Sequence, residues 1–313
     1  MKKTNILVTG GAGYIGSVLV PMLLQANYAV TVVDTFSFGQ LSLANLCIDP
    51  SFHLVRADAR DESTMSRLIT KADIVIPLAA LVGAPMCAKD PVGADSLNRD
   101  AIRWLCKNLA TDQRLLLPNT NSGYGIGDTN SFCTEDSPLR PISLYGTSKV
   151  EAELIALERE NSITFRLATV FGMSPRMRLD LLVNDFTYRA VTDRAIVIFE
   201  GHFKRNYIHV RDVARAFLHG IEKFDAMRSR PYNVGLSSAN LSKLELAERI
   251  KSLVPNFTYL ESAIGTDPDQ RNYIVSNERI ERTGYLPSFS LDDGITELIK
   301  GYQMIRNNQY TNL

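Results

Sequence analysis

The chain has 313 residues, of which 45% are hydrophobic and 22% charged, a composition typical of a globular protein with a large buried core. The 34 basic residues balance the 34 acidic ones, so no net charge attracts nucleic acid or an anionic membrane, and we expect neither as a partner. The four cysteines (Cys47, Cys87, Cys106 and Cys133) form no C-x-x-C pair, and neither a signal peptide nor a membrane-spanning segment is recognisable, so we expect a cytoplasmic protein with reduced thiols.

The first predicted elements form a βαβ unit. Residues 5–9 are a short apolar run that ends at two glycines, which predicts a buried strand. Residues 14–24 have helical spacing of apolar side chains, and Pro21 is expected either to kink this helix or to mark where its regular part begins. A second apolar run, residues 29–33, ends at Asp34. Strand, glycine turn, helix and strand in about thirty residues is the βαβ pattern.

The alternation continues along the first half of the chain. Further strands are predicted at 53–55, 73–78, 114–117 and 164–167, and helices at 62–70, 98–109 and 145–160. Alternating strands and helices predict an α/β fold with a doubly wound parallel sheet of the Rossmann type.

The pattern changes after residue 172. Polar and aromatic segments at 173–178 and 200–207 mix with short strands at 196–199 and 208–209 and helices at 212–222, 243–253 and 291–303. We therefore predict a dinucleotide-binding domain over residues 1–172 and a smaller substrate-binding lobe over residues 173–313. The two are expected to interleave in part, because the helix at 212–222 can pack back on the first domain.

Residues 9–16 read T-G-G-A-G-Y-I-G, between a predicted strand and a predicted helix. In this context Gly10 permits a tight turn, Gly13 lets the backbone approach a pyrophosphate, and Gly16 lets the helix pack against the strand. The helix N-terminus offers N–H groups and a positive dipole end to the phosphates. Asp34 follows 18 residues after Gly16 and suits the adenosine ribose hydroxyls. No Arg or Lys closely follows Asp34, so we expect NAD rather than NADP; the alternative is a structural turn with a surface aspartate.

Tyr145 and Lys149 form a Y-x-x-x-K pair at the start of a predicted helix. Their spacing of four places both side chains on one helix face. The lysine ammonium favours the phenolate and so lowers the phenol pKa, which allows the tyrosine to accept a proton from an alcohol whose carbon loses hydride. The pair is common by chance and gains weight only from its place downstream of the glycine turn.

Residues 115–125 read L-L-L-P-N-T-N-S-G-Y-G at a predicted strand end. Together with the two motifs above, this segment resembles extended short-chain dehydrogenases/reductases of the NAD-dependent nucleotide-sugar epimerase/dehydratase family, which carry a Ser/Thr four residues before a Tyr-Gly pair. The resemblance spans nearly the whole chain and implies that Thr120 hydrogen-bonds the reacting hydroxyl, Tyr145 is the base, and Lys149 binds the nicotinamide ribose. It also implies a nucleotide-sugar substrate and a homodimer built on segments near 102–109 and 150–159.

The resemblance assigns further positions one by one. The implied NAD-binding residues are Gly10, Gly13, Tyr14, Ile15, Gly16, Asp34, Asp58, Ala59, Leu78, Ala79, Ala80, Asn98, Tyr145 and Lys149. The implied substrate-binding residues are Thr120, Asn121, Ser122, Thr169, Asn184, Arg205 and Arg271. The two arginines are expected to hold the sugar diphosphate, since guanidinium pairs phosphate oxygens in two-point contacts. For Arg271 the alternative is a surface ion pair with Asp267 or Asp269.

The sequence departs from the family pattern at the positions that distinguish the dehydratases from the other enzymes of the family. Dehydratases of the family place an acidic pair directly after the catalytic Thr, where this chain has Asn121 and Ser122, so a 4,6-dehydratase is disfavoured. Residues 118–127, 176–186 and 195–213 resemble bacterial enzymes that oxidise C4 of a GDP-linked heptose for capsular polysaccharides and keep NAD(H) tightly bound. We therefore predict a GDP-heptose 4-dehydrogenase, with a 4-epimerase as the alternative. Thr169 stands where many relatives have Asn, which should alter contacts to nicotinamide or sugar.

Other classes of protein fit the sequence less well. A non-catalytic NAD-binding protein would be expected to have lost Tyr145 or Lys149. A steroid or flavonoid reductase of the same fold should lack the two arginines. The four histidines show no ligand spacing, so we expect no metal.

Overall fold

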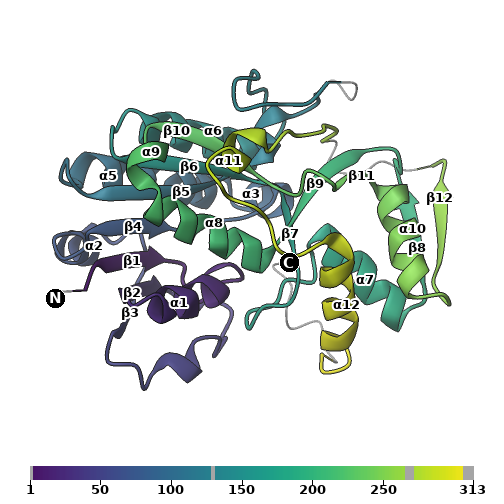
Figure 1. Cartoon of the computed structure of the whole chain (residues 1–313), viewed down its shortest axis with the longest axis horizontal. Helices are drawn as coiled ribbons and strands as arrows, with labels where there is room; N and C mark the ends of the chain where they lie inside the picture. Colours follow the sequence, from purple (N-terminus) through teal and green to yellow (C-terminus); the bar gives the residue numbers. More distant parts are fainter. Residues whose placement is uncertain (1–2, 128–130, 265–270, 306–313) are drawn as a thin grey trace.

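The computed structural model describes residues 3–127, 131–264 and 271–305. Its main element is a seven-stranded sheet with the order β10-β6-β5-β4-β1-β2-β3, in which every pair is parallel (Figure 1). The strands are β1 Asn5–Thr9, β2 Ala29–Asp34, β3 Phe52–Arg56, β4 Ile74–Pro77, β5 Arg114–Thr120, β6 Ser162–Leu167 and β10 Arg230–Val234. This sheet confirms the predicted doubly wound α/β fold.

Helices cover both faces of the sheet, and alternate side chains of each strand pack under one set or the other. Ile6 and Val8 of β1 join a core with α1 and α8, whereas Leu7 joins a second core with α2, α5 and α6. These helices are α1 Gly16–Gln25, α2 Glu62–Ile69, α5 Ala101–Asn108, α6 Leu144–Leu157 and α8 Val210–Glu222. None of the described helices has the length and apolar character needed to cross a membrane.

The short connecting elements lie mostly between these helices and strands. They are η1 Ala44–Leu46, α3 Ala84–Lys89, α4 Pro91–Asp95, the π-turn η2 Ser96–Asp100, η3 Asn121–Tyr124, α9 Phe224–Met227 and α11 Glu278–Glu281. The helix predicted at 98–109 therefore begins as a π-turn. Pro21 lies inside α1, which begins at Gly16. The helix therefore continues through Pro21, although proline has no backbone N–H to donate to the preceding turn.

A smaller lobe lies beyond the carboxyl ends of the central strands (Figure 1). It contains a three-stranded sheet, β11-β9-β7, and a two-stranded sheet, β12-β8. Its elements are β7 Thr169–Phe171, α7 Leu182–Thr192, β8 Ala195–Phe199, β9 Lys204–His209, β11 Asn240–Ser242, α10 Lys243–Leu253, β12 Thr258–Ser262 and α12 Leu291–Gly301.

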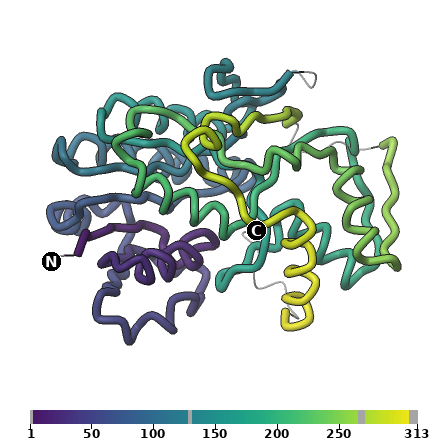
Figure 2. The backbone as a smooth tube through the Cα atoms, in the orientation of Figure 1, coloured from purple at the N-terminus to yellow at the C-terminus, as the bar shows by residue number. Residues whose placement is uncertain are grey.

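The two lobes share the chain in an interleaved way, as the trace in Figure 2 shows. After β9 the chain returns to the large sheet, where α8 packs beside α1 and β10 pairs with β6. It then goes back to the small lobe for β11 and α10. A split at residue 172 therefore separates α8 and β10 from the sheet to which they belong.

Candidate active site

The site predicted from the sequence lies where the strand order reverses. β1 is the first strand in sequence, and it lies between β2 and β4 in the sheet. Loops from neighbouring strands therefore diverge at the carboxyl ends of β1 and β4, and this is where parallel α/β sheets bind ligands. Gly10 follows β1, Leu78 follows β4 and Thr120 ends β5, so the fold brings three separate sequence motifs to this edge.

Gly10, Gly13 and Gly16 of the first turn lie in different surroundings, so a side chain at each position would have a different effect. Gly10 has φ of 69°, and a Cβ there would lie 2.6 Å from the backbone nitrogen of Ala79. A Cβ on Gly16 would lie 2.5 Å from the carbonyl oxygen of Gly11. A Cβ on Gly13 would meet only Gly10 O, at 3.1 Å. Close packing thus explains Gly10 and Gly16, whereas the space beside Gly13 suits the approach of a ligand.

The start of α1 fits the diphosphate of NAD. No side chain caps this helix terminus, and its first turn contains no acidic residue, so its positive dipole end is available to an anion, although Ser17 N and Val18 N already donate to Gly13 O and Ile15 O. Asp34 ends β2 beside the turn, where its carboxylate accepts hydrogen bonds from Ala12 N at 3.0 Å and Phe36 N at 2.8 Å. Gly13 and Asp34 would face the diphosphate and the adenosine ribose. Ile15 precedes the helix directly, and its backbone belongs to the same turn.

The loop after β4 is held in place by Asn98. This side chain is 1% exposed; its Oδ1 accepts from Leu81 N and its Nδ2 donates to Leu81 O, both at 2.9 Å. Asn98 thus fixes Leu81, which directly follows residues 78–80, and these three are half-buried along the predicted cofactor path. Asp58 pairs with Arg60 at 2.6 Å, and this hydrogen bond lowers the pKa of the carboxyl. Asp58 and Ala59 as adenine contacts remain predictions.

Thr120, Tyr145 and Lys149 all lie near the carboxyl end of β5. Tyr145 lies in the first turn of α6, which Ser143 caps by accepting from Gly146 N at 3.1 Å, and its phenol is close enough to Thr120 for that side chain to lower its pKa. Lys149 follows one turn later, is 5% exposed, and donates to Pro118 O at 2.6 Å. The arrangement joins a hydroxyl, a phenol and an ammonium at one strand end, as proton transfer from an alcohol requires.

The charges around these groups oppose the effect of burial. Burial raises the pKa of Tyr145, whereas the Arg178 and Arg271 guanidinium groups and the Thr120 hydrogen bond lower it. Burial lowers the pKa of Lys149 to about 8, and the nearby Glu153 carboxylate acts in the opposite direction. The ammonium form of Lys149 therefore depends on negative charge supplied by Glu153.

The two residues after Thr120 carry no acid. Ser122 Oγ lies 2.9 Å from Thr120 Oγ1 and accepts a hydrogen bond from the Arg271 guanidinium. Asn121 is 1% exposed, and neither its Nδ2 nor its Oδ1 has a partner among the described residues. The described partners of Thr120 and Ser122 are thus hydroxyl, amide and guanidinium groups. Asp267 and Asp269, the alternative partners suggested for Arg271, lie outside the described residues.

The other predicted substrate residues occupy different settings. Arg205 on β9 is 3% exposed, donates to Lys204 O at 3.0 Å, and lies over the Tyr273 ring. Thr169 begins β7 and is half-buried. Their contacts with a sugar or diphosphate remain predictions.

Asn184 and Tyr14 join the two lobes. Asn184 is fully buried; it accepts from Gly172 N at 3.0 Å and donates to Tyr14 Oη at 3.2 Å and to Arg178 O at 2.9 Å. Tyr14 Oη in turn donates to Gly172 O at 2.6 Å, and burial raises its pKa. Both side chains therefore have protein partners, and a contact between the Asn184 amide and a diphosphate would require rearrangement.

A buried ionic network beneath the predicted catalytic residues was not predicted from the sequence. Glu153, with no exposed surface, accepts from the Arg166 Nε and Nη2 at 2.9 and 2.7 Å, from Asn119 Nδ2 at 2.6 Å, and from Thr164 Oγ1 at 3.0 Å. Asn119 Oδ1 accepts from Thr120 N at 2.8 Å. The network thus holds the end of β5. The sequence feature that could have indicated this network is the spacing of Glu153, which lies four residues after Lys149 on the same helix face.

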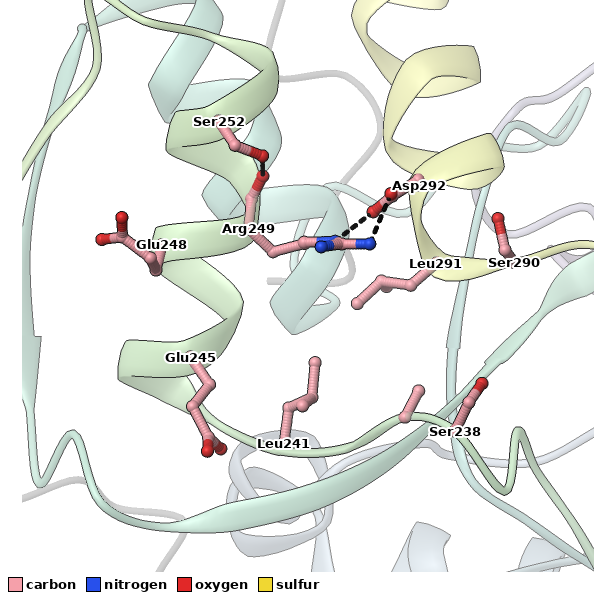
Figure 3. Close-up of a pocket in the computed structure, with 10 residues that line it drawn as sticks. Ser238, Leu241, Glu245, Glu248, Arg249, Ser252, Ser290, Leu291 and Asp292 are labelled. Carbon is pink, nitrogen blue, oxygen red and sulfur yellow. Dashed lines mark hydrogen bonds and ion pairs between the residues drawn. The ribbon is translucent and has the colours of Figure 1, made fainter.

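A hollow of about 490 Å³ lies away from these residues, on the small lobe between α10 and α12 (Figure 3). Arg249 of α10 points across it and pairs with both carboxylate oxygens of Asp292, at 2.6 and 2.7 Å. Glu245 and Glu248 also line it. None of the predicted site residues lines this hollow, so we assign the chemistry to the sheet edge.

Comparison with known proteins identifies the family of the chain. The model of the NAD dependent epimerase/dehydratase family matches residues 6–235, more than half of the chain. The chain belongs to this family. A dTDP-glucose 4,6-dehydratase from Actinoplanes is 29% identical, covering 97% of this chain and 99% of its own length. The low-salt glycan biosynthesis protein Agl12 from Haloferax volcanii is 28% identical, covering 95% and 98%.

A solved structure of the same fold has a different activity in its name. The UDP-glucose 4-epimerase from Thermotoga maritima, determined with UDP-glucose, has a TM-score of 0.82 and 25% identity, covering 96% of this chain and 99% of that chain. Membership of the epimerase/dehydratase family makes this chain an NAD-dependent enzyme. Because named relatives include a dehydratase and an epimerase, membership of the family does not determine the reaction, which depends on the side chains of the site.

Proposed function

We propose that this enzyme oxidises C4 of a nucleotide-activated sugar, and that its substrate is a GDP-linked heptose. The observation that carries the proposal is the joining of Thr120, Tyr145 and Lys149 at the end of β5, followed by Asn121 and Ser122. The first three residues serve oxidation of an alcohol, and the next two offer no acid for elimination. The choice of GDP-heptose rests on the resemblance of residues 118–127, 176–186 and 195–213.

Oxidation needs a proton acceptor and a hydride acceptor at one carbon. NAD, when bound, supplies the hydride acceptor. Thr120 and Tyr145 would hold the C4 hydroxyl between them, and Tyr145 would take its proton as the C4 hydrogen leaves with the bonding electrons. Lys149, kept charged with help from Glu153, would stabilise the phenolate. The sugar is left as the 4-ketone.

Dehydration would need further groups, and the two positions after Thr120 do not supply them. Loss of water across C5 and C6 requires a base for the C5 proton and an acid for the departing hydroxyl. The Asn121 amide cannot donate as an acid, and Ser122 shares its hydroxyl with Thr120 and Arg271. The reaction named for the Actinoplanes relative is therefore not proposed for this chain.

Two arginines of the substrate lobe, residues 173–313, would hold the diphosphate. Arg205 and Arg271 approach from separate segments, and Arg271 reaches the catalytic end through Ser122. A guanidinium can pair two phosphate oxygens at once. Thr169 and Asn184 would adjust the sugar pocket from β7 and α7.

A 4-epimerase is the second candidate. The similarity in fold and sequence to the Thermotoga epimerase favours it, and the same three catalytic residues would perform its first half-reaction. In that case the ketone stays bound and takes the hydride back on its other face. A 4-dehydrogenase therefore releases the 4-keto sugar, whereas a 4-epimerase releases a sugar of unchanged mass with inverted C4.

We also propose a homodimer that pairs α5 and α6 of one subunit with those of the next. On α6, Ala152 and Ala156 are buried against the sheet, whereas Leu154 on the outer face is 57% exposed. Light scattering of the purified protein would give twice the chain mass, and a monomer would contradict this pairing.

The experiment that tests the reaction is product analysis with a panel of GDP-, UDP- and CDP-sugars, with and without a 2-keto acid as oxidant. The proposal expects loss of two hydrogens from a GDP-heptose, sustained only when oxidant is present. An unchanged mass with an inverted C4 proton signal would instead establish a 4-epimerase. Loss of water would contradict the argument from Asn121 and Ser122.

A further inference from the structure

A segment of the small lobe is fastened across the start of α1. We call residues 173–178, which follow β7, the strap. Ser174 Oγ donates to Tyr14 O at 2.7 Å and lies 2.8 Å from Ser17 Oγ, which also accepts from Arg176 N at 3.4 Å. At its beginning, Met173 N donates to Glu297 of α12 at 3.0 Å. The strap is thus tied both to the phosphate-binding turn and to the small lobe.

The strap carries Arg176 into a buried position beside the predicted adenosine site. Its side chain is 3% exposed, and its guanidinium carbon lies 4.0 Å from the centre of the Phe38 ring. Its Nη1 donates to Met177 O at 2.5 Å, and the Asp34 carboxylate attracts it electrostatically. The ring stacks on the cation in the geometry of a cation–π contact.

The segment that carries Phe38 is itself folded onto the glycine turn. Gln40 Nε2 and Ser42 Oγ both donate to Ala12 O, at 3.2 and 2.8 Å. The Arg176 guanidinium therefore lies among the loop after β2, the acid that ends β2, and the start of α1. These three features face the adenosine ribose and the diphosphate in a dinucleotide-binding fold.

Two sources of positive potential meet at this point. Arg176 contributes a buried guanidinium, and the adjacent terminus of α1 has neither a side-chain cap nor an acid in its first turn. A phosphate group placed between them would be attracted by both, and a guanidinium can pair two phosphate oxygens at once.

We propose that Arg176 closes over the adenosine diphosphate half of NAD and that the strap keeps the cofactor bound between turnovers. Arg176 lies 142 positions after Asp34 in the sequence, and the fold alone brings them together. Since the strap belongs to the small lobe, exchange of the cofactor requires its contacts with Tyr14 and Ser17 to open. This goes beyond the proposed reaction and does not depend on which sugar is bound.

The test measures release of NAD without any sugar. Purified holoenzyme is mixed with excess isotopically labelled NAD, and the unlabelled NAD remaining on the protein is followed by mass spectrometry. Arg176→Ala should release NAD about tenfold faster or more, as expected for loss of one charge-assisted hydrogen bond, and should copurify with less of it. Arg176→Lys should fall between this variant and the unmodified protein, and Phe38→Ala should also speed release.

A matched control uses a second arginine that stacks on an aromatic ring. Arg114 lies 4.7 Å from the centre of the Phe224 ring at the opposite end of β5, and Arg114→Ala should leave NAD release unchanged. Circular dichroism and urea unfolding of each variant would separate loss of fold from loss of cofactor. Normal release from a folded Arg176→Ala variant would overturn the proposal.

Competition with ADP-ribose and NADP locates the contact. Because ADP-ribose contains the diphosphate and both riboses without nicotinamide, Arg176→Ala should weaken it in parallel with NAD. Weakened NADP with unchanged NAD and ADP-ribose would mean that Arg176 reads a 2′-phosphate, which would overturn the assignment. These outcomes are independent of whether the enzyme is a dehydrogenase or an epimerase.

Discussion

The buried ammonium of Lys149 should make the cofactor-free protein more stable as the pH rises from about 8 to about 10.5. In the folded protein, burial lowers the pKa of Lys149 from its usual 10.5 to about 8. Between these values the unfolded chain binds more protons than the folded one, so the free energy of unfolding increases with pH. The full destabilisation is present below pH 8 and is lost above 10.5.

The size of the effect follows from the two pKa values. They differ by about 2.5, and each pKa unit corresponds to about 1.4 kcal/mol, so the contribution is about 3 kcal/mol. The assay is urea unfolding of NAD-free protein at several pH values, with Lys149→Met as the comparison. Methionine fills a similar volume without a charge, and the free-energy difference between the two proteins should change by about 3 kcal/mol across this window.

The readout is the pH dependence rather than the stability at one pH. Methionine leaves Pro118 O without the Nζ donor at 2.6 Å, which offsets part of the absolute gain. Lys300→Met, on the exposed face of α12 and away from the proposed dimer contact, is the control and should follow the unmodified protein. Parallel pH curves for Lys149→Met and the unmodified protein would refute the reasoning.

Three further substitutions test the site. Tyr145→Phe should abolish turnover while NAD stays bound, measured by product formation and cofactor content; near-normal activity would remove Tyr145 from its role. Arg205→Ala should weaken nucleotide-sugar binding far more than NAD binding in calorimetry, and equal weakening would make Arg205 structural. Glu153→Gln should lower the free energy of unfolding by about 3–5 kcal/mol, because it leaves the Arg166 cation buried without its partner. A loss below about 1 kcal/mol in urea unfolding would contradict that account of the network.

Local sequence patterns were enough to predict the sheet and the cofactor turn. β1, β2 and the glycines between them obey rules that act within one βαβ unit, so apolar spacing and backbone sterics determine them. Tyr145 and Lys149 lie one helical turn apart, so their meeting also follows from local geometry. Resemblance to a family then added Thr120, whose contact with Tyr145 joins a strand end to a helix start.

Contacts between distant segments were beyond the reach of local patterns. β10 joins the main sheet 63 positions after β6 ends, and no periodicity indicates which sheet an apolar run will enter. Asn184 was predicted to face a diphosphate, but its amide joins Tyr14 to Gly172 in the structure. Arg176 lies in the segment 176–186, which contributed to the resemblance, but the sequence assigned no role to its side chain, because its contacts depend on Phe38 and the start of α1.

The most direct test of the central claim follows the hydrogen on C4. Protein carrying NAD would be mixed with GDP-heptose deuterated at C4, without added oxidant, and the bound cofactor would be analysed by mass spectrometry. Our account predicts reduced cofactor that carries one deuterium, together with a 4-keto sugar. Cofactor that stays oxidised and unlabelled, while the enzyme converts the sugar to a product without a C4 ketone, would contradict net oxidation at C4; an inverted C4 that retains its deuterium would identify the 4-epimerase.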